Sequence, residues 1–204
     1  MKTYILIFTL LFTICGCKKN NSQDLSQFKD GDIIFHTSKS SQSKMLENVT
    51  DSKLTHVGVI FYKDNSPFVV EAVNPVKITP LKSFIARGAN SDFIVMRPNF
   101  ELSNEDKKIM YGYAKSQLGK SYDSKFQWSD NKMYCSELVW KIYKSAGYEL
   151  CDVKKFSDYN LDNDLAKSAI NNRYKNTKFN ISESVVAPSD LYDSNKLSTI
   201  VDTY

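Results

Sequence analysis

The order of strand-like and helix-like segments constrains the fold of this chain most. Residues 55–62 are rich in β-branched and aromatic side chains without a helical period, and a short turn separates them from a similar segment at 68–73. The long segments with apolar side chains at helical spacing come later, at 103–118 and 135–146. Strands joined by short turns pair antiparallel, so the sequence predicts an α+β fold with an antiparallel sheet packed against helices.

Shorter segments complete this prediction. We expect further strands at 33–35, 76–79, 92–97, 185–188 and 197–201. Short helices are expected from near Ser41, over 81–85, and from Ser189. Residues 147–184 have no clear period, so we expect them to be irregular. Together these segments predict one domain, over residues 28–204.

The chain begins with a short, strongly apolar segment. Residues 4–14 follow a lysine and lead into Ile-Cys-Gly-Cys, which ends at Cys17. About a dozen apolar residues are too few to span a bilayer, and the arrangement resembles a bacterial lipoprotein signal. We therefore expect a signal peptide at 1–16, a lipid on Cys17, a polar tether at 17–27 and attachment to a membrane of a bacterial cell envelope. An ordinary signal peptide or a buried N-terminal strand are the alternatives.

The weak net charge and the small number of possible metal ligands argue against nucleic acid and metal ions as partners. The net charge is +4, from 27 basic and 23 acidic residues that are scattered along the chain. Such weak, scattered charge argues against nucleic acid as a partner. The chain has only two histidines and no cysteine pair at zinc-ligand spacing, so we expect no metal site and no cofactor. We also expect a monomer.

Cys135 is the first residue that suggests chemistry. It stands where a loop enters the predicted helix 135–146. The free N–H groups and the positive end of the helix dipole favour a thiolate at such a position, and a thiolate is the nucleophilic form of cysteine. A buried cysteine at the start of a core helix is the alternative. A disulfide between Cys135 and Cys151 fits this context poorly, and Cys151 reads more simply as a small, partly buried side chain.

A nucleophilic thiol needs a base and a group that orients it. His56 begins the strand 55–62, whereas His36 stands at a loop edge and is expected at the surface. Glu71 interrupts the apolar segment 68–73, and a carboxylate there is costly unless it is paired. If the two strands pair, His56 and Glu71 become neighbours on one face. The alternatives are a half-buried structural histidine and a glutamate that faces water on an edge strand.

Five short motifs in order resemble a known family. They are Gly-Asp-Ile-Ile-Phe at 31–35, Thr-His-Val-Gly-Val at 55–59, Val-Glu-Ala at 70–72, Gly-Lys-Ser-Tyr-Asp at 119–123 and Tyr-Cys-Ser-Glu-Leu-Val-Trp at 134–140. This pattern is similar to the YiiX- and YebB-like branch of the NlpC-type superfamily, which comprises permuted papain-like cysteine amidases. The resemblance covers residues 28–202. The circular permutation explains why the histidine precedes the cysteine.

The resemblance implies roles for individual residues. Cys135 would be the nucleophile, His56 the base and Glu71 the group that orients the imidazole. Tyr134 would line the substrate site or help the oxyanion hole. Asp32, Tyr122 and Asp123 are also carried over: Asp32 would lie near the site in a structural role, with substrate binding or the oxyanion hole as the alternative, and Tyr122 and Asp123 would shape the cleft wall. His36 has no matching role; it is expected at the surface, and a position that faces the cleft is the alternative.

The implied substrate is an amide in a cell-wall peptide, such as a peptidoglycan fragment. This agrees with a lipid anchor at the envelope. Two alternatives stay open: a lipid acyl hydrolase or acyltransferase on the same fold, and an envelope binding module without catalysis.

Overall fold

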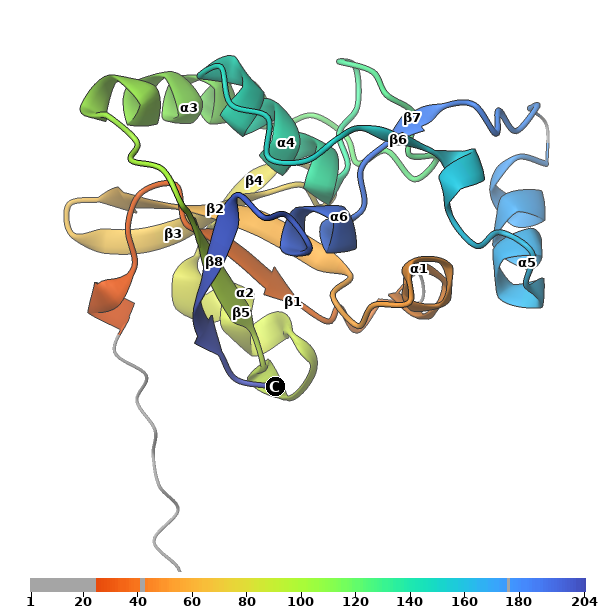
Figure 1. Ribbon diagram of the computed structural model, residues 1–204, viewed down its shortest axis with the longest axis horizontal. Helices are drawn as coiled ribbons and strands as arrows, with labels where there is room; N and C mark the ends of the chain where they lie inside the picture. The colour runs from red at the N-terminus through yellow and green to blue at the C-terminus, as the bar shows by residue number, and fades with distance from the viewer. Residues whose placement is uncertain (1–24, 41–42, 176) are drawn as a thin grey trace, which may run out of the picture.

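A six-stranded antiparallel sheet carries the fold (Figure 1). The computed structural model describes residues 25–40, 43–175 and 177–204. The strand order is β4–β3–β2–β1–β5–β8. The strands are β1 (Ile33–His36), β2 (His56–Lys63), β3 (Ser66–Glu71), β4 (Lys77–Pro80), β5 (Ile94–Pro98) and β8 (Leu197–Asp202). The expected α+β fold, with an antiparallel sheet packed against helices, is confirmed.

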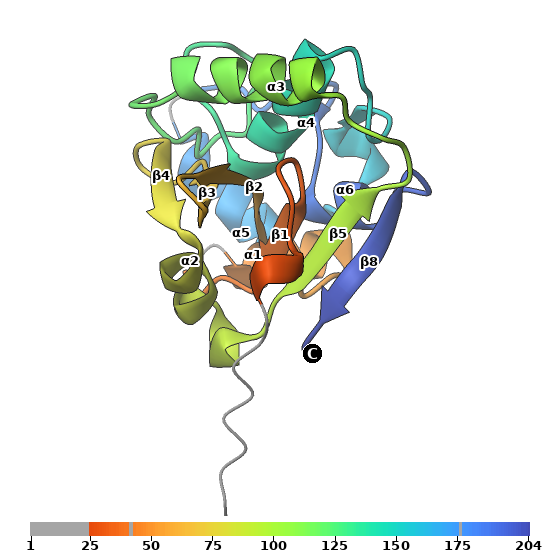
Figure 2. The same ribbon diagram turned by 90° about the vertical axis from the view of Figure 1, so that its left-hand side faces the viewer.

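Helices cover both faces of this sheet (Figure 2). The helices of the described residues are α1 (Ser43–Thr50), α2 (Leu81–Arg87), α3 (Asn104–Ser116), α4 (Cys135–Ser145), α5 (Asp164–Arg173) and α6 (Pro188–Tyr192). Short 3-10 turns lie at Leu25–Gln27, Ala89–Ser91 and Phe156–Asp158, and β6 (Lys154–Lys155) pairs with β7 (Ser184–Val185). Helices α3 and α4 pack over one face of the sheet, and α2 packs against the other. Among the described residues, no helix is long and apolar enough to cross a membrane.

Two sequence expectations are wrong in detail. The stretch expected to be irregular contains α5, which begins after Asn163 because the Asn163 side chain accepts a hydrogen bond from the Ala166 N–H at 2.9 Å. Helix α5 has one fully buried side chain, Ala166, while Leu165 is exposed, so no apolar stripe reveals it. The strand expected at 185–188 ends at Val185, and α6 begins at Pro188, a residue that suits the first turn of a helix.

Of the predicted signal peptide and tether, the structure describes only residues 25–27. The signal peptide at 1–16, Cys17 and the tether as far as residue 24 lie outside the described residues. Residues 25–27, which the sequence assigns to the tether, form a turn held to the sheet. The Leu25 carbonyl accepts from the Tyr62 hydroxyl at 3.1 Å, and the Gln27 carbonyl accepts from Arg97 at 2.9 Å. The folded unit therefore includes these three residues.

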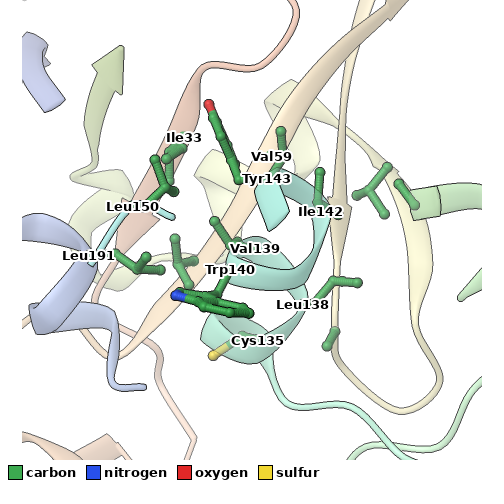
Figure 3. Packing of buried hydrophobic residues seen from close by; sticks show 14 of the residues in the cluster. Ile33, Val59, Cys135, Leu138, Val139, Trp140, Ile142, Tyr143, Leu150 and Leu191 are labelled. Carbon is green, nitrogen blue, oxygen red and sulfur yellow. The ribbon is translucent and has the colours of Figure 1, made fainter. Parts of the chain in front are cut away.

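Helix α4 is the most deeply buried helix of the site. Leu138, Val139, Ile142 and Tyr143 are fully buried in the core that α4 shares with β1 and β2. Figure 3 shows Cys135 at the end of this packed row. Burying one such aliphatic side chain stabilises a fold by about 1.5–3 kcal/mol. The start of α4 is therefore fixed against the sheet.

Gly58 of β2 is a packing requirement next to the site. A Cβ atom there would lie 2.4 Å from Val69 Cγ1 and 2.9 Å from the Val70 carbonyl oxygen. We expect Gly58→Ala to lower the free energy of unfolding by about 1–3 kcal/mol, because β3 cannot move away from β2 without breaking the ladder. Chemical denaturation measures this change. Gly112→Ala on α3 is the matched control: nothing lies within 4 Å of its added Cβ, so it should stabilise the protein by about 0.5–1 kcal/mol. Equal effects of the two changes would contradict the prediction.

Candidate active site

Cys135 is the first residue of α4 and is buried. The helix starts at this point because Tyr134 has an extended backbone and donates its N–H to Glu137 Oε2 at 3.3 Å. Backbone N–H groups of Val57 and Ser136 bond to the Cys135 sulfur. Val57 is free to do so because the β2–β3 ladder begins only at Val59. These donors and the helix start favour the thiolate.

His56 and Glu71 form a buried pair beside Cys135. His56 begins β2, Glu71 ends the neighbouring β3, and His56 Nε2 lies 2.6 Å from Glu71 Oε2. The His56 side chain also bonds to Cys135, and Nδ1 is the ring nitrogen left for that contact. Neighbouring strands thus bring the residues together, as the sequence predicts. The resulting order is thiol, imidazole, carboxylate.

The electrostatics of these residues favour an ion pair. Burial alone would lower the pKa of His56, but its hydrogen bonds to Cys135 and Glu71 outweigh burial and raise the pKa to about 9. Burial alone would raise the pKa of Cys135, yet the hydrogen bond and charge of His56 hold it below its usual value. The shifts are reciprocal, so the resting site favours thiolate and imidazolium.

Glu71 is anchored on every side. Its carboxylate accepts hydrogen bonds at 2.5 Å from both Thr79 Oγ1 and Arg87. Burial would raise the pKa of Glu71, but its bonds with His56, Arg87 and Thr79 lower it to about 2. The alternative of a solvent-facing edge position is wrong, because β3 lies between β2 and β4 and Glu71 is fully buried. Glu71 is therefore a fixed anion that orients His56.

Tyr122 and Tyr134 contact different groups near the Cys135 thiol. The Tyr122 side chain bonds to Cys135, and burial together with the charge of Cys135 raises the pKa of Tyr122 well above its usual range. The Tyr134 hydroxyl instead accepts the Val186 N–H at 3.2 Å, and its ring meets Phe126 edge to face. The Tyr122 hydroxyl thus lies at the Cys135 thiol, whereas Tyr134 supports the wall beside it.

The structure does not bring Asp32 to the site. Asp32 precedes β1 at the end away from His36, and it forms an ion pair with Arg97 at 2.7 Å. The expectation that Asp32 lies near the site is wrong, because Asp32 stands at the end of β1 that is far from His56. Asp123 is buried and accepts the Lys125 and Gln127 N–H groups, which shapes the loop after α3.

Cys151 stays apart from the reactive group. Cys135 and Cys151 are both free thiols, as expected from the poor fit of a disulfide. Burial and the charge of Asp190 raise the pKa of Cys151 to about 12. Only Cys135 of these two therefore has thiolate character near neutral pH.

His36 is not at the surface, so that expectation is wrong. It ends β1 directly opposite His56, is buried, and places its ring centroid 5.0 Å from that of His56 and 4.6 Å from that of Phe84. Neither ring nitrogen has a hydrogen-bond partner among the described residues. Burial and the charge of His56 lower the pKa of His36 to about 3. The sequence placed His36 at a loop edge, and the strand pairing explains its burial.

The contact between Cys135 and His56 lies between two different cavities, because Cys135 lines one and His56 lines the other. On one side is an apolar chamber with a cavity volume of about 60 Å³. It is lined by side chains of α1, α5 and segments 156–161 and 179–188, with Tyr134 and Cys135 at the helix start. On the other side is a more polar cleft that reaches His56, Thr55, Asn74 and Tyr122. A substrate bound across Cys135 can thus place different groups on its two sides.

Three comparisons bear on this arrangement. A family model described as "Permuted papain-like amidase enzyme, YaeF/YiiX, C92 family" matches residues 27–201. The YiiX protein of Escherichia coli K12 is 37% identical over 202 residues, covering 98% of this chain and 96% of its own. A crystal structure of YiiX from Escherichia coli O157:H7, described as a metalloprotein, matches with a TM-score of 0.83 at 39% identity, over 87% of this chain and 99% of that one. In the described part of the present chain, no group of three or more His, Cys, Asp and Glu side chains could hold a metal ion.

Proposed function

Because this chain belongs to the permuted papain-like amidase family of YaeF and YiiX, we propose that it hydrolyses an amide bond through a thioester on Cys135. The observation that carries the proposal is that His56 contacts both Cys135 and Glu71, with a hydrogen bond of 2.6 Å between His56 and Glu71. A triad is recognised by this geometry and not by the order of its members along the chain.

The first chemical step forms the thioester. The Cys135 thiolate attacks the amide carbonyl carbon, and the electron pair of the C=O bond moves to oxygen. The N–H of Cys135, one of the donors at a helix start without a partner in the helix, supports this oxyanion together with the Tyr122 hydroxyl. His56 then gives its proton to the leaving amine, and the C–N bond breaks.

The second step regenerates the enzyme. Neutral His56 takes a proton from water, and the resulting hydroxide attacks the thioester carbonyl. The C–S bond breaks, the acid leaves, and the thiolate and imidazolium are restored. Glu71 stays ionised throughout and keeps Nδ1 of His56 turned toward the sulfur.

We place the substrate among the amides of cell-wall peptides. The support is the lipoprotein-like N-terminus, which predicts a location at the envelope, and the polar cleft beside His56, which suits a peptide. The test is digestion of purified muropeptides by a protein that begins at residue 25, followed by mass spectrometry. New products with a mass gain of one water and a free amine are expected; intact muropeptides would reject this substrate.

A second candidate function is favoured by the apolar chamber. Met45, Leu46, Ile170 and Phe179 line it together with Cys135, and such an apolar lining suits a hydrocarbon part of an acyl group. A lipid acyl hydrolase or acyltransferase would use the same thioester. Incubation with a phospholipid separates the two functions, because a fatty acid released or transferred from it is the product of this one alone.

The pH dependence of the reaction follows from His56. Leaving-group protonation needs the imidazolium, so we expect kcat/KM to fall as the pH rises through about 9, where His56 loses its proton. Glu71→Gln removes the negative charge that helps to raise this pKa, so the falling limb should move to lower pH. Rate measurements from pH 6 to 10 on both proteins test this. A falling limb that stays in place in Glu71→Gln would contradict the assigned pair.

A further inference from the structure

Two basic residues, Arg173 and Lys125, line the otherwise apolar chamber. Most of its side chains are aliphatic or aromatic, and several of them come from α1 and from α5, which lie beside each other (Figure 1). Arg173, the last residue of α5, lines the same chamber as Cys135. A guanidinium is rarely placed in an apolar chamber without a partner, because removing its charge from water is costly.

Arg173 differs from the other two arginines of the chain. Arg87 pairs with buried Glu71 at 2.5 Å, and Arg97 pairs with buried Asp32 at 2.7 Å. No carboxylate of residues 25–40, 43–175 or 177–204 forms an ion pair with Arg173. Its guanidinium lies over the Phe126 ring, 4.9 Å from the centroid. Burial lowers the pKa of Arg173 below the usual value of arginine, and the cation still has no anion beside it.

The unpaired cation acts close to the nucleophile. The positive charge of Arg173 opposes the rise in the pKa of Tyr122, so the two side chains lie near each other, and Tyr122 itself bonds to Cys135. Lys125 borders the same chamber and has no carboxylate partner in the described chain; its Nζ bonds to Thr177 Oγ1 at 2.9 Å. The nearby carboxylate of Asp123 already accepts two backbone N–H groups. The chamber therefore combines an apolar lining with positive charge.

We propose that Arg173 binds a carboxylate of the substrate while an apolar group of the same molecule fills the chamber. This rests on the proposed function, since it names the chemistry of the amide that Cys135 attacks. The guanidinium presents parallel N–H donors that match a carboxylate. Pairing with a carboxylate also reduces the free-energy cost of the partly buried, unpaired cation, which adds to the binding. N-acyl amino acids and the peptides of cell walls both carry this combination.

Alkylation of Cys135 tests the charge recognition without any hydrolysis. Iodoacetate and iodoacetamide react with a thiolate in the same way but differ by one carboxylate. We expect Arg173→Met to lower the ratio of the iodoacetate rate to the iodoacetamide rate by about tenfold, because one charge-assisted contact is lost. The measurement uses a Cys151→Ser background, so that Cys135 is the only alkylated thiol of the folded domain. Methionine keeps the apolar contact with Phe126.

Two control variants make the outcome decisive. Lys178→Met removes one positive charge from an exposed residue outside the chamber lining and should change the ratio less than twofold. Arg173→Lys keeps the charge and should keep most of the preference. An equal fall in Lys178→Met and Arg173→Met, or no fall in Arg173→Met, would overturn the proposal. If the ratio responds but no amide is hydrolysed, the proposed function alone fails.

Matched substrates then identify the source of the carboxylate. One pair is N-dodecanoylglycine and its C-terminal amide, and the other is a short cell-wall peptide and its amide. The wild-type protein should prefer the carboxylate of the pair that it cleaves by about tenfold in kcat/KM, through KM, and Arg173→Met should lose this preference. A cleaved pair without preference would overturn the assignment of Arg173.

Discussion

Cys135→Ala is expected to abolish amide hydrolysis, with a loss of about a million-fold that takes the rate below detection. The reason is that the thiolate supplies the only covalent route, and neither His56 nor Tyr122 can replace it. Product formation by mass spectrometry, with the same substrate that the wild-type protein cleaves, measures the loss. The side chain is small, and the α4 residues that follow it keep their packing, so the fold should persist.

Cys151→Ala is the control for this experiment. Its thiol is free like that of Cys135, but its pKa is raised to about 12, so it is not a nucleophile near neutral pH. We expect nearly full activity in this variant. Hydrolysis that survives in Cys135→Ala, or disappears in Cys151→Ala, would show that the nucleophile lies elsewhere.

The neighbourhood of Cys135, His56 and Glu71 could be predicted from the sequence because its signals are local. Cys135 stands at a helix start, His56 at a strand start, and Glu71 is a charge inside an apolar strand; each breaks an otherwise simple pattern. The pairing of neighbouring strands then brings His56 and Glu71 together. The strand pattern is therefore sufficient to predict that these two residues are neighbours.

Residues whose role depends on long-range packing could not be predicted in the same way. His36 lies in a strand that the sequence ends one residue too early, so its pairing opposite His56 was missed. Arg173 lies on α5. This helix has one fully buried side chain, so the sequence pattern reveals neither the helix nor the position of Arg173. Asp32 shows the reverse error: its motif suggested the site, but β1 carries it to the far end of the sheet and to Arg97.

The strongest test of the base is His56→Gln. We expect kcat/KM to fall by about 10³-fold, because proton transfer to the leaving amine and from water is lost. The variant also removes the hydrogen bond and positive charge that lower the pKa of Cys135, and the burial that remains raises it. The pH midpoint for alkylation of Cys135 by iodoacetamide should therefore move upward.

His36→Gln is the matched control, since His36 faces His56 across β1 and β2 and makes only ring contacts. Its imidazole is neutral near pH 7, so its replacement should change kcat/KM less than tenfold and leave the alkylation midpoint in place. An alkylation midpoint that does not depend on His56 would mean that no thiolate–imidazolium pair exists. The chain would then be an envelope binding module that has kept the fold of an amidase, because the pair is the feature that binding alone does not need.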